Sequence, residues 1–292
     1  MMNKEEIYWI WFSRLQNLNI KQKEILLNMY KTPKNIWDLN EKELSKIKEI
    51  NNENISEILS KKYRTNLDKY LNYMNKENIK IITIYNNQYP QKLNNIYDKP
   101  YILFAKGNLE LLNTESIAIV GCRNCTEYGK NISKRISYNI AKNNKCIISG
   151  LARGVDTYAH LGALEANGKT IAVVGNGLDT VYPYENKNLY ERILKNNGLI
   201  ISEYIIGTKP DRLNFPMRNR IISGLADGIV VVEAKKKSGS LITADFALEQ
   251  GKDIFAIPGN INSNNSEGTN ELIKQGCYLA TDYKDILDVC YN

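Results

Sequence analysis

The segment "NFPMRNR", residues 214–220, places one aromatic ring beside two arginines and an amide. A phenyl face can stack on a nucleic-acid base, and guanidinium groups form charge-assisted hydrogen bonds with phosphates. A helix that begins after Pro216 would direct further N–H groups at a phosphate. The candidate binding residues are Lys209, Arg212, Phe215, Arg218, Asn219 and Arg220. A second interpretation stays open, because residues 217–225 also fit a buried helix in which at least one polar side chain fixes neighbouring loops.

Four glycine-bearing segments each follow an apolar run of strand length. They are Gly121–Gly129, Ser149–Asp156, Gly175–Asp179 and Lys235–Ala244. In a parallel sheet such turns share one edge, where helix N-termini present free N–H groups to anions. We therefore expect an anion-binding rim, with Ser240 as a helix N-cap. Its glycines and cations are Gly121, Arg123, Gly150, Arg153, Gly154, Lys235–Lys237 and Gly239.

Other motifs carry weaker signals. The turns match neither G-x-G-x-x-G nor G-x-x-x-x-G-K-[ST], so neither a dinucleotide cofactor nor ATP hydrolysis is favoured. Cys122 and Cys125 form a single C-x-x-C; a closed zinc site needs four ligands, and the turn suits anion binding better than redox chemistry. His160, the one histidine, is four residues after Asp156 and is read as half of a structural polar pair. We expect no catalytic residue, no metal and no cofactor.

The glycines also divide the chain. All 18 lie at or after Gly107, and the residues before them show helical periodicity. We predict a small helical domain over residues 1–78, resembling a SAM or helix-hairpin-helix domain, and a connecting segment over residues 79–113 with short strands near 79–84 and 101–104. A Rossmann-like domain is predicted over residues 114–292.

That last region alternates apolar runs with helix-length stretches. The predicted strands cover residues 116–120, 146–149, 170–174, 199–202, 228–234, 253–259 and 277–280. Predicted helices cover residues 127–142, 156–167, 240–250 and 269–275. Continuous apolar strands separated by helices are typical of a parallel sheet that is covered on both faces. The fold class is α/β: an extended Rossmann-like, doubly wound, mostly parallel sheet preceded by a small all-helical domain.

Composition is that of a soluble globular protein, with 43% hydrophobic and 24% charged residues among 292. No apolar run approaches the ~20 residues that span a bilayer, and the start shows no export signal. We therefore expect a cytoplasmic protein with free thiols and no membrane partner. The net charge of +7 is compatible with nucleic acid and does not demonstrate it.

The ordered motifs resemble one family. These are "VGCRNCTEYG", "SGLARGVDTYAHLGAL", "TIAVVGNGLDTVYP", "GLIISEYIIGTKP", "FPMRNRIISGLADGIVVVEA", "SGSLITADFALEQGKDIFAIPG" and "GTNELIKQG". Their order and spacing over residues 110–280 resemble the DNA-processing DprA family, also called Smf. The chain departs from the family's pattern at Cys122 and Thr126, where members carry serine. "KIKEINNENI" has no hairpin glycine, so residues 1–80 are not expected to bind DNA independently, and no C-terminal winged helix is expected.

The resemblance implies a non-enzymatic protein that binds single-stranded DNA without sequence preference. It also implies a homodimer that hands the strand to the RecA recombinase in natural transformation or recombination, displacing or bypassing single-strand-binding protein. Carried over by motif, the DNA-binding residues are Arg123, Lys209, Phe215, Arg218, Arg220, Gly239, Ser240 and Leu241.

Two rival functions stay open. The fold type is shared with the cytokinin-activating phosphoribohydrolases, which hydrolyse an N-glycosidic bond of nucleotide derivatives. Their P-G-G-x-G-T-x-x-E loop would fall near "SGSLITADFALE", where the glycines and the spacing to Glu249 differ. The other rival is an interaction scaffold whose glycine rim binds nothing.

Overall fold

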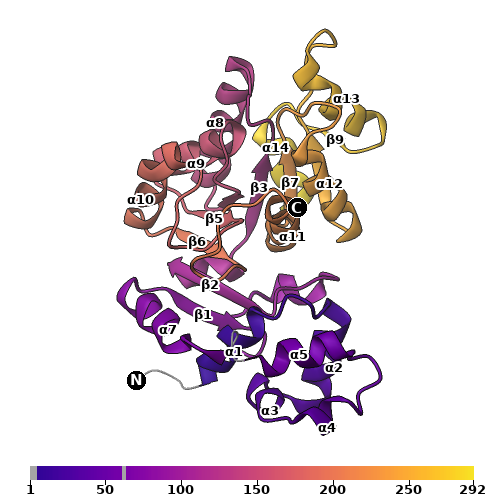
Figure 1. Ribbon diagram of the computed structural model, residues 1–292. Coiled ribbons are helices and arrows are strands. Elements are labelled where there is room, and N and C mark those ends of the chain that lie inside the picture. The colour runs from indigo at the N-terminus through magenta and orange to yellow at the C-terminus, as the bar shows by residue number, and fades with distance from the viewer. Residues whose placement is uncertain (1–4, 61–63) are drawn as a thin grey trace. The chain divides into compact units, whose positions relative to one another are not determined.

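The computed structural model describes residues 5–60 and 64–292. The chain divides into two compact units, Met1–Thr83 and Ile84–Asn292 (Figure 1). Each unit has its own buried side chains and is described by itself. No helix in the described ranges is long and apolar enough to span a bilayer.

The first unit consists of short helices followed by one strand. These are α1 (Glu5–Ser13), α2 (Ile20–Tyr30), α3 (Pro33–Trp37), α4 (Glu41–Leu44), α5 (Asn52–Leu59), α7 (Leu67–Lys76) and β1 (Lys80–Thr83). Asn19, Asn40 and Asn51 cap α2, α4 and α5, each accepting a hydrogen bond from the backbone N–H three residues further on. Part of the asparagine-rich composition therefore serves to start helices. The predicted helical N-terminal region is confirmed.

The core of the first unit combines aromatic rings with one buried carboxylate. Trp11 packs edge-on against Trp37, with ring centroids 5.1 Å apart. Glu57 is buried and accepts hydrogen bonds from the backbone N–H groups of Gln16 at 2.8 Å and Asn17 at 3.0 Å. Because these N–H groups belong to the turn between α1 and α2, the carboxylate of α5 fixes that turn.

The second unit is built on one sheet. Its strands are β2 (Ile102–Gly107), β3 (Ser116–Val120), β4 (Cys146–Ser149), β5 (Thr170–Val174), β6 (Leu199–Ser202), β7 (Gly228–Val231), β8 (Asp253–Ala256) and β9 (Tyr278–Leu279). Their order is β2-β6-β5-β4-β3-β7-β8-β9. Only the β2–β6 pair is antiparallel among these strands. The predicted mostly parallel sheet is confirmed, and β2, in the predicted connecting segment, is one of its strands.

Helices cover both faces of this sheet. They are α8 (Glu127–Lys142), α9 (Val155–Glu165), α10 (Lys187–Lys195), α11 (Asn214–Leu225), α12 (Gly239–Glu249), α13 (Glu267–Lys274) and α14 (Tyr283–Tyr291). Figure 1 shows α8, α9 and α10 on one side and α12 on the other, and α11 packs along α12. The helices after β3 and β7 thus leave the sheet towards opposite faces. Such a switch point opens a crevice at the carboxyl ends of the strands.

Between the sheet and the α8–α9 pair lies a continuous apolar core. It includes Ile119 of β3, Ile140 of α8 and Val230 of β7. Ser133 and Ser137 of α8 donate hydrogen bonds to the carbonyls of Val155 and Ala159 in α9, which satisfies these hydroxyls inside the helix pair.

Three strands are shorter than their apolar runs, and β9 loses one residue at each end of the predicted 277–280. β7 ends at Val231 and β8 at Ala256, three residues before the predicted ends. The chain beyond β7 stays buried but turns to support a loop: the Glu233 carbonyl accepts a hydrogen bond from the Cys122 N–H at 2.7 Å. Residues 232–234 therefore belong to the rim of the sheet.

Gly107, the last residue of β2, gives a direct test of this packing. Its φ is +115°, and an added Cβ would lie 2.2 Å from the Gly198 carbonyl oxygen. We predict that Gly107→Ala lowers the free energy of unfolding by about 2 kcal/mol or more, because backbone strain and a backbone clash add. The measurement is urea unfolding followed by circular dichroism. Gly251→Ala is the matched control: its φ is +65° but its Cβ would meet open space, so it should cost about 1 kcal/mol. Equal losses would contradict the packing described.

Candidate nucleic-acid interface

A pocket of about 590 Å³ opens at the carboxyl edge of the sheet, where β3 and β7 lie side by side. Its walls come from the loops after β3, β4 and β7, from the start of α9, from the start of α11 with the residues just before it, and from the first turns of α12. The polar and aromatic residues among them are Arg123, Asn124, Asp156, Arg212, Phe215, Arg218, Asn219, Lys235, Lys237, Ser238, Ser240 and Thr243. The position is that expected of a ligand site in an open α/β sheet.

Phe215 stands at the rim of this pocket, in the first turn of α11. The helix begins at Asn214, so Pro216 lies inside its first turn, not before it as expected; a proline is tolerated there because that N–H needs no intrahelical partner. The phenyl ring is half-buried and stacks on Tyr182, with centroids 5.5 Å apart and an interplanar angle of 22°. The guanidinium carbon of Arg123 lies 5.1 Å from the same ring centroid.

Arg218 lies one turn further along α11 and points under the rim. Its side chain is 5% exposed and donates from Nη1 to the carbonyl of Gly150 at 2.7 Å and to that of Val173. Burial lowers the pKa of Arg218 to about 10, and the nearby Asp156 carboxylate partly offsets this, so the group stays protonated at neutral pH. Arg218 therefore fastens α11 to the ends of β4 and β5 while forming part of the pocket wall.

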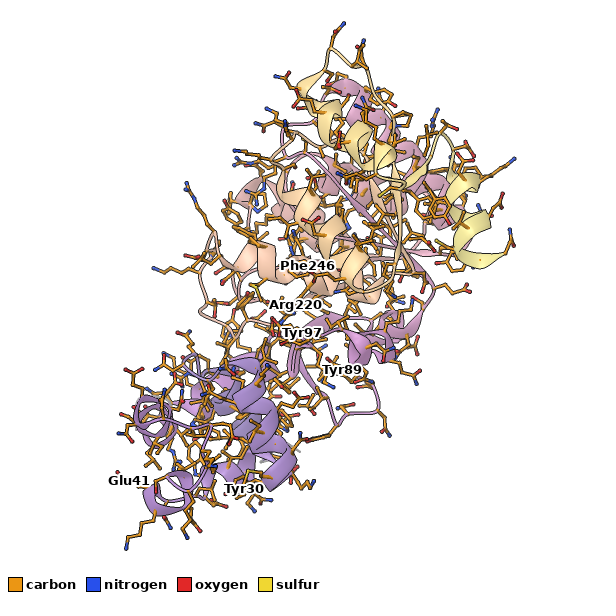
Figure 2. All side chains as sticks on the ribbon, turned by 90° about the vertical axis from the view of Figure 1, so that its right-hand side faces the viewer. Tyr30, Glu41, Tyr89, Tyr97, Arg220 and Phe246 are labelled. Carbon is orange, nitrogen blue, oxygen red and sulfur yellow. The ribbon has the colours of Figure 1, made fainter. Side chains whose placement is uncertain are left out.

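Arg220 has a different role from the one expected. It is 3% exposed; its Nη2 donates to both Glu203 carboxylate oxygens at 2.8 Å, and its Nε lies 3.1 Å from Asp98 Oδ2. Figure 2 labels Arg220 together with Tyr89 and Tyr97, from the segment that supplies Asp98. Two residues along a helix turn the side chain by about 200°, so Arg220 points away from Arg218. The placement corrects its assignment as a phosphate-binding residue.

Asn219, between the two arginines, connects α11 to α12. Its Nδ2 donates to the Gly239 carbonyl at 3.2 Å, and its Oδ1 accepts from Arg218 Nε at 3.2 Å. The structural interpretation, a buried helix over residues 217–225 in which at least one polar side chain fixes its neighbours, agrees with the contacts of all three polar side chains. Of the three, Arg218 and Asn219 still line the pocket.

Only some of the residues predicted to bind DNA outside residues 214–220 come together in the pocket. Gly121, Arg123, Arg212, Gly239 and Ser240 line it, whereas Gly150, Gly154, Lys209 and Leu241 are outside its lining. Gly154 has φ +73°, and an added Cβ would lie 2.2 Å from the Cys122 carbonyl oxygen, so this glycine is needed for the contact between two loops. Gly150 is needed because Arg218 packs against it.

The N-cap of α12 is Ser238, not Ser240 as expected. Ser238 Oγ accepts a hydrogen bond from the Ser240 N–H at 3.4 Å, and the two hydroxyl oxygens lie 2.8 Å apart. An added Cβ at Gly239 would meet nothing within 4 Å, so a ligand can approach the backbone there. The first turn of α12 thus brings hydroxyls and N–H groups to the pocket, an arrangement that favours anions.

Charge in the lining is mostly positive. Arg123, Arg212, Lys235 and Lys237 are exposed side chains. Asp156, in contrast, is buried and accepts hydrogen bonds from the N–H groups of Gly150 and Ala152. Burial raises the pKa of Asp156, while Arg218 opposes the rise. Four exposed cations around a polar pocket suit a polyanion.

Residues outside this arrangement are also informative. Arg153 is paired with Glu185 in a bidentate contact. The Asp156–His160 pair is not formed as expected: His160 Nδ1 lies 2.7 Å from Thr170 Oγ1, and burial lowers its pKa to about 3. The sequence analysis did not identify Tyr182 as a site residue. The one feature that could have indicated it is its position, since it is an aromatic residue shortly after the glycine turn that follows β5.

The cysteine and metal signals remain weak. Burial raises the pKa of Cys125 to about 11, with the Glu233 carboxylate adding to the rise, and burial also raises that of Cys122. These groups are therefore thiols, not reactive thiolates, at neutral pH. Over residues 5–60 and 64–292, no His, Cys, Asp and Glu side chains cluster as a metal site.

Arg220 allows the structural role to be tested. We predict that Arg220→Ala lowers the free energy of unfolding by about 3 kcal/mol, because it leaves Asp98 and Glu203 without their cation. Urea unfolding gives the measurement. Arg153→Ala removes an exposed arginine with a comparable bidentate partner, and it should leave the urea midpoint close to that of the wild type because water screens the pair. A wild-type midpoint for Arg220→Ala would show that the buried ion pairs do not hold α11.

Comparison with known proteins gives a consistent picture. The sequence model of the family described as DNA recombination-mediator protein A matches residues 80–290. DNA processing protein DprA of Streptococcus pneumoniae is 48% identical over 199 residues, which are 68% of this chain and 70% of that protein. The X-ray structure of S. pneumoniae DprA covers 100% of this chain and 99% of its own, with a TM-score of 0.79 and 36% identity.

A second similar structure is of a relative that is described as binding single-stranded DNA. It is DNA processing protein A from Helicobacter pylori, whose structure is described as giving insight into a unique single-stranded DNA binding mode. It covers 72% of this chain and 95% of its own, with a TM-score of 0.65 and 33% identity. The family is one of recombination mediators, not enzymes, and the fold and the ordered motifs agree with it. The chain belongs to the DNA recombination-mediator protein A family, whose curated members are named DprA or Smf.

Proposed function

We propose that this chain binds single-stranded DNA at the carboxyl edge of its sheet, without sequence preference, and hands the strand to the RecA recombinase. One observation carries the proposal: Phe215 stands at the rim beside Arg123, above a pocket lined by three further exposed cations. Stacking and phosphate contacts work for any base, because every base has a π face and every nucleotide a phosphate.

The division of labour follows from the contacts. Phe215 is the stacking side chain, and Arg123, Arg212, Lys235 and Lys237 are the phosphate ligands. Lys209 is exposed in the loop before α11 and extends the cationic path. Arg218 and Asn219 have a supporting role: their hydrogen bonds to neighbouring backbone carbonyls hold the first turn of α11 in place. Single strands are preferred because the bases of a duplex are stacked on each other and cannot present a free face.

Partners and setting are further parts of the proposal. The family's description as a recombination mediator supports delivery of the strand to RecA, in natural transformation or another recombination process, in the cytoplasm. A homodimer would offer two such edges to one strand. The rival N-glycosidase function is not favoured, because Glu249 is the last residue of α12, at the end opposite to the pocket.

Salt-dependent binding tests the proposal. We predict that fluorescence anisotropy shows tighter binding of oligo-dT than of a duplex of equal length, with affinity that falls steeply as salt rises. Phe215→Leu should weaken binding by ~1–3 kcal/mol with an unchanged salt slope. Arg123→Gln should weaken binding and reduce the slope by about 1, since one phosphate contact is lost.

Matched controls come from elsewhere in the second unit. Arg135, exposed on α8, and Phe246, partly exposed on α12, lie outside the pocket lining. Arg135→Gln and Phe246→Leu should bind oligo-dT as the wild type does. Binding that is independent of salt, or unchanged in both rim variants, would refute the proposal. Release of free base from nucleoside monophosphates would replace it with the N-glycosidase function.

A further inference from the structure

We infer that Tyr182 is a second base-stacking side chain, which carries the bound strand from the main pocket across Phe215 towards the end of β5. The inference rests on the proposed function and deepens it. Tyr182 comes from the loop after β5, whereas Phe215 comes from α11, so two separate segments bring two aromatic rings together. Their rings are nearly parallel, at 22°, with centroids 5.5 Å apart.

The exposure of the two rings differs in a useful way. Tyr182 is 43% exposed, whereas Phe215 is the less exposed of the two side chains. A tyrosine that served only to fill a core would be covered, with its hydroxyl bonded inside the protein. Tyr182 instead presents a large part of its surface at the edge where the cations gather. A base that stacks on Tyr182 would extend the stack that Tyr182 and Phe215 form in the protein.

A second, smaller pocket shows where the path leads. It is lined by Tyr182 and Pro183 together with Gly175 and Asn176 from the loop after β5. Arg123, Phe215 and Arg218 line both this pocket and the main one, so the two are neighbours that share a wall. Arg153 also lines the smaller pocket; it is exposed and pairs with Glu185.

Close packing keeps the column in place. An added Cβ at Gly175 would lie 2.9 Å from Phe215 Cδ1, so this glycine lets the loop after β5 approach the ring. Because Arg218 Nη1 also binds the carbonyl of Val173, the end of β5 and the start of α11 are fastened to each other below the rings. The spacing of Tyr182 and Phe215 is thus set by the protein before a strand binds.

Three substitutions and a modified strand test the inference. Tyr182→Leu should weaken oligo-dT binding roughly tenfold, with an unchanged salt slope, since stacking is lost and no phosphate contact is. Tyr182→Phe and Tyr182→Trp keep an aromatic face and should bind within about twofold of the wild type. On an abasic strand of equal length, Tyr182→Leu and wild type should bind equally, because there is no base to stack.

Tyr138→Leu is the matched control. Tyr138 is 36% exposed, close to the exposure of Tyr182, but it lies in the second half of α8, away from the carboxyl edge. The Tyr138→Leu variant should bind oligo-dT as the wild type does. Circular dichroism should show that Tyr138→Leu and Tyr182→Leu are both folded.

Each outcome has a distinct meaning. Wild-type or tighter oligo-dT binding by Tyr182→Leu would overturn the inference; tighter binding would make Tyr182 a cover over Phe215. Equal loss on dT and on the abasic strand would also overturn it, since the effect would not act through bases. Failure of the wild type itself to bind oligo-dT would refute the proposed function, and with it the inference. Loss confined to Phe215→Leu would leave the proposed function standing and remove only Tyr182 from the path.

Discussion

Two buried guanidinium groups on one helix determine how the carboxyl edge of this sheet is built. Arg218 binds the carbonyls that end β4 and β5, and Arg220, turned to the other side of α11, binds Asp98 and Glu203. A buried charge is costly unless it is paired, so each arginine holds its partners in one arrangement. Held from two sides, α11 has one position on the sheet, and Phe215 is fixed at the rim.

The other features of the rim follow from that helix. A side chain at position 150 would collide with the guanidinium group of Arg218, so a glycine stands there. In the same way, a side chain at position 175 would collide with the ring of Phe215. Asn219 of α11 donates a hydrogen bond to the Gly239 carbonyl of α12. This contact holds the first turn of α12 at the pocket. The exposed cations then surround a preformed surface. A ligand that stacks on it need not order the backbone, which lowers the conformational cost of binding.

The sequence predicts this fold well for a physical reason. Strands buried on both faces must be apolar throughout, so β3, β4, β5 and β6 were located to the residue by their apolar runs. The glycine turns between strands and helices marked the correct edge. What periodicity and glycines cannot show is which polar side chains point into the protein. Arg220 and Arg123 are the same residue type in motifs that both indicate anion binding. Only Asp98 and Glu203, 122 and 17 residues from Arg220, make it a buried ion pair while Arg123 stays an exposed cation.

Tyr182 illustrates the same limit. Its contact with Phe215 joins a loop to a helix 33 residues further along the sequence. The contact depends on the distance between the end of β5 and the start of α11, which no local pattern encodes. The N-cap of α12 was misplaced for a smaller reason. "KSGS" offers two serines, and the backbone of Gly239, already helical, decides for Ser238.

Hydrogen–deuterium exchange with and without oligo-dT tests most directly whether the edge held by Arg218 and Arg220 is the DNA-binding surface. We predict protection by DNA in residues 121–125, 178–183, 211–217 and 235–241, which surround the two pockets. Protection confined to the turns at the opposite edge of the sheet, residues 143–145, 167–169 and 196–198, or to the helices of the first unit, would contradict the account.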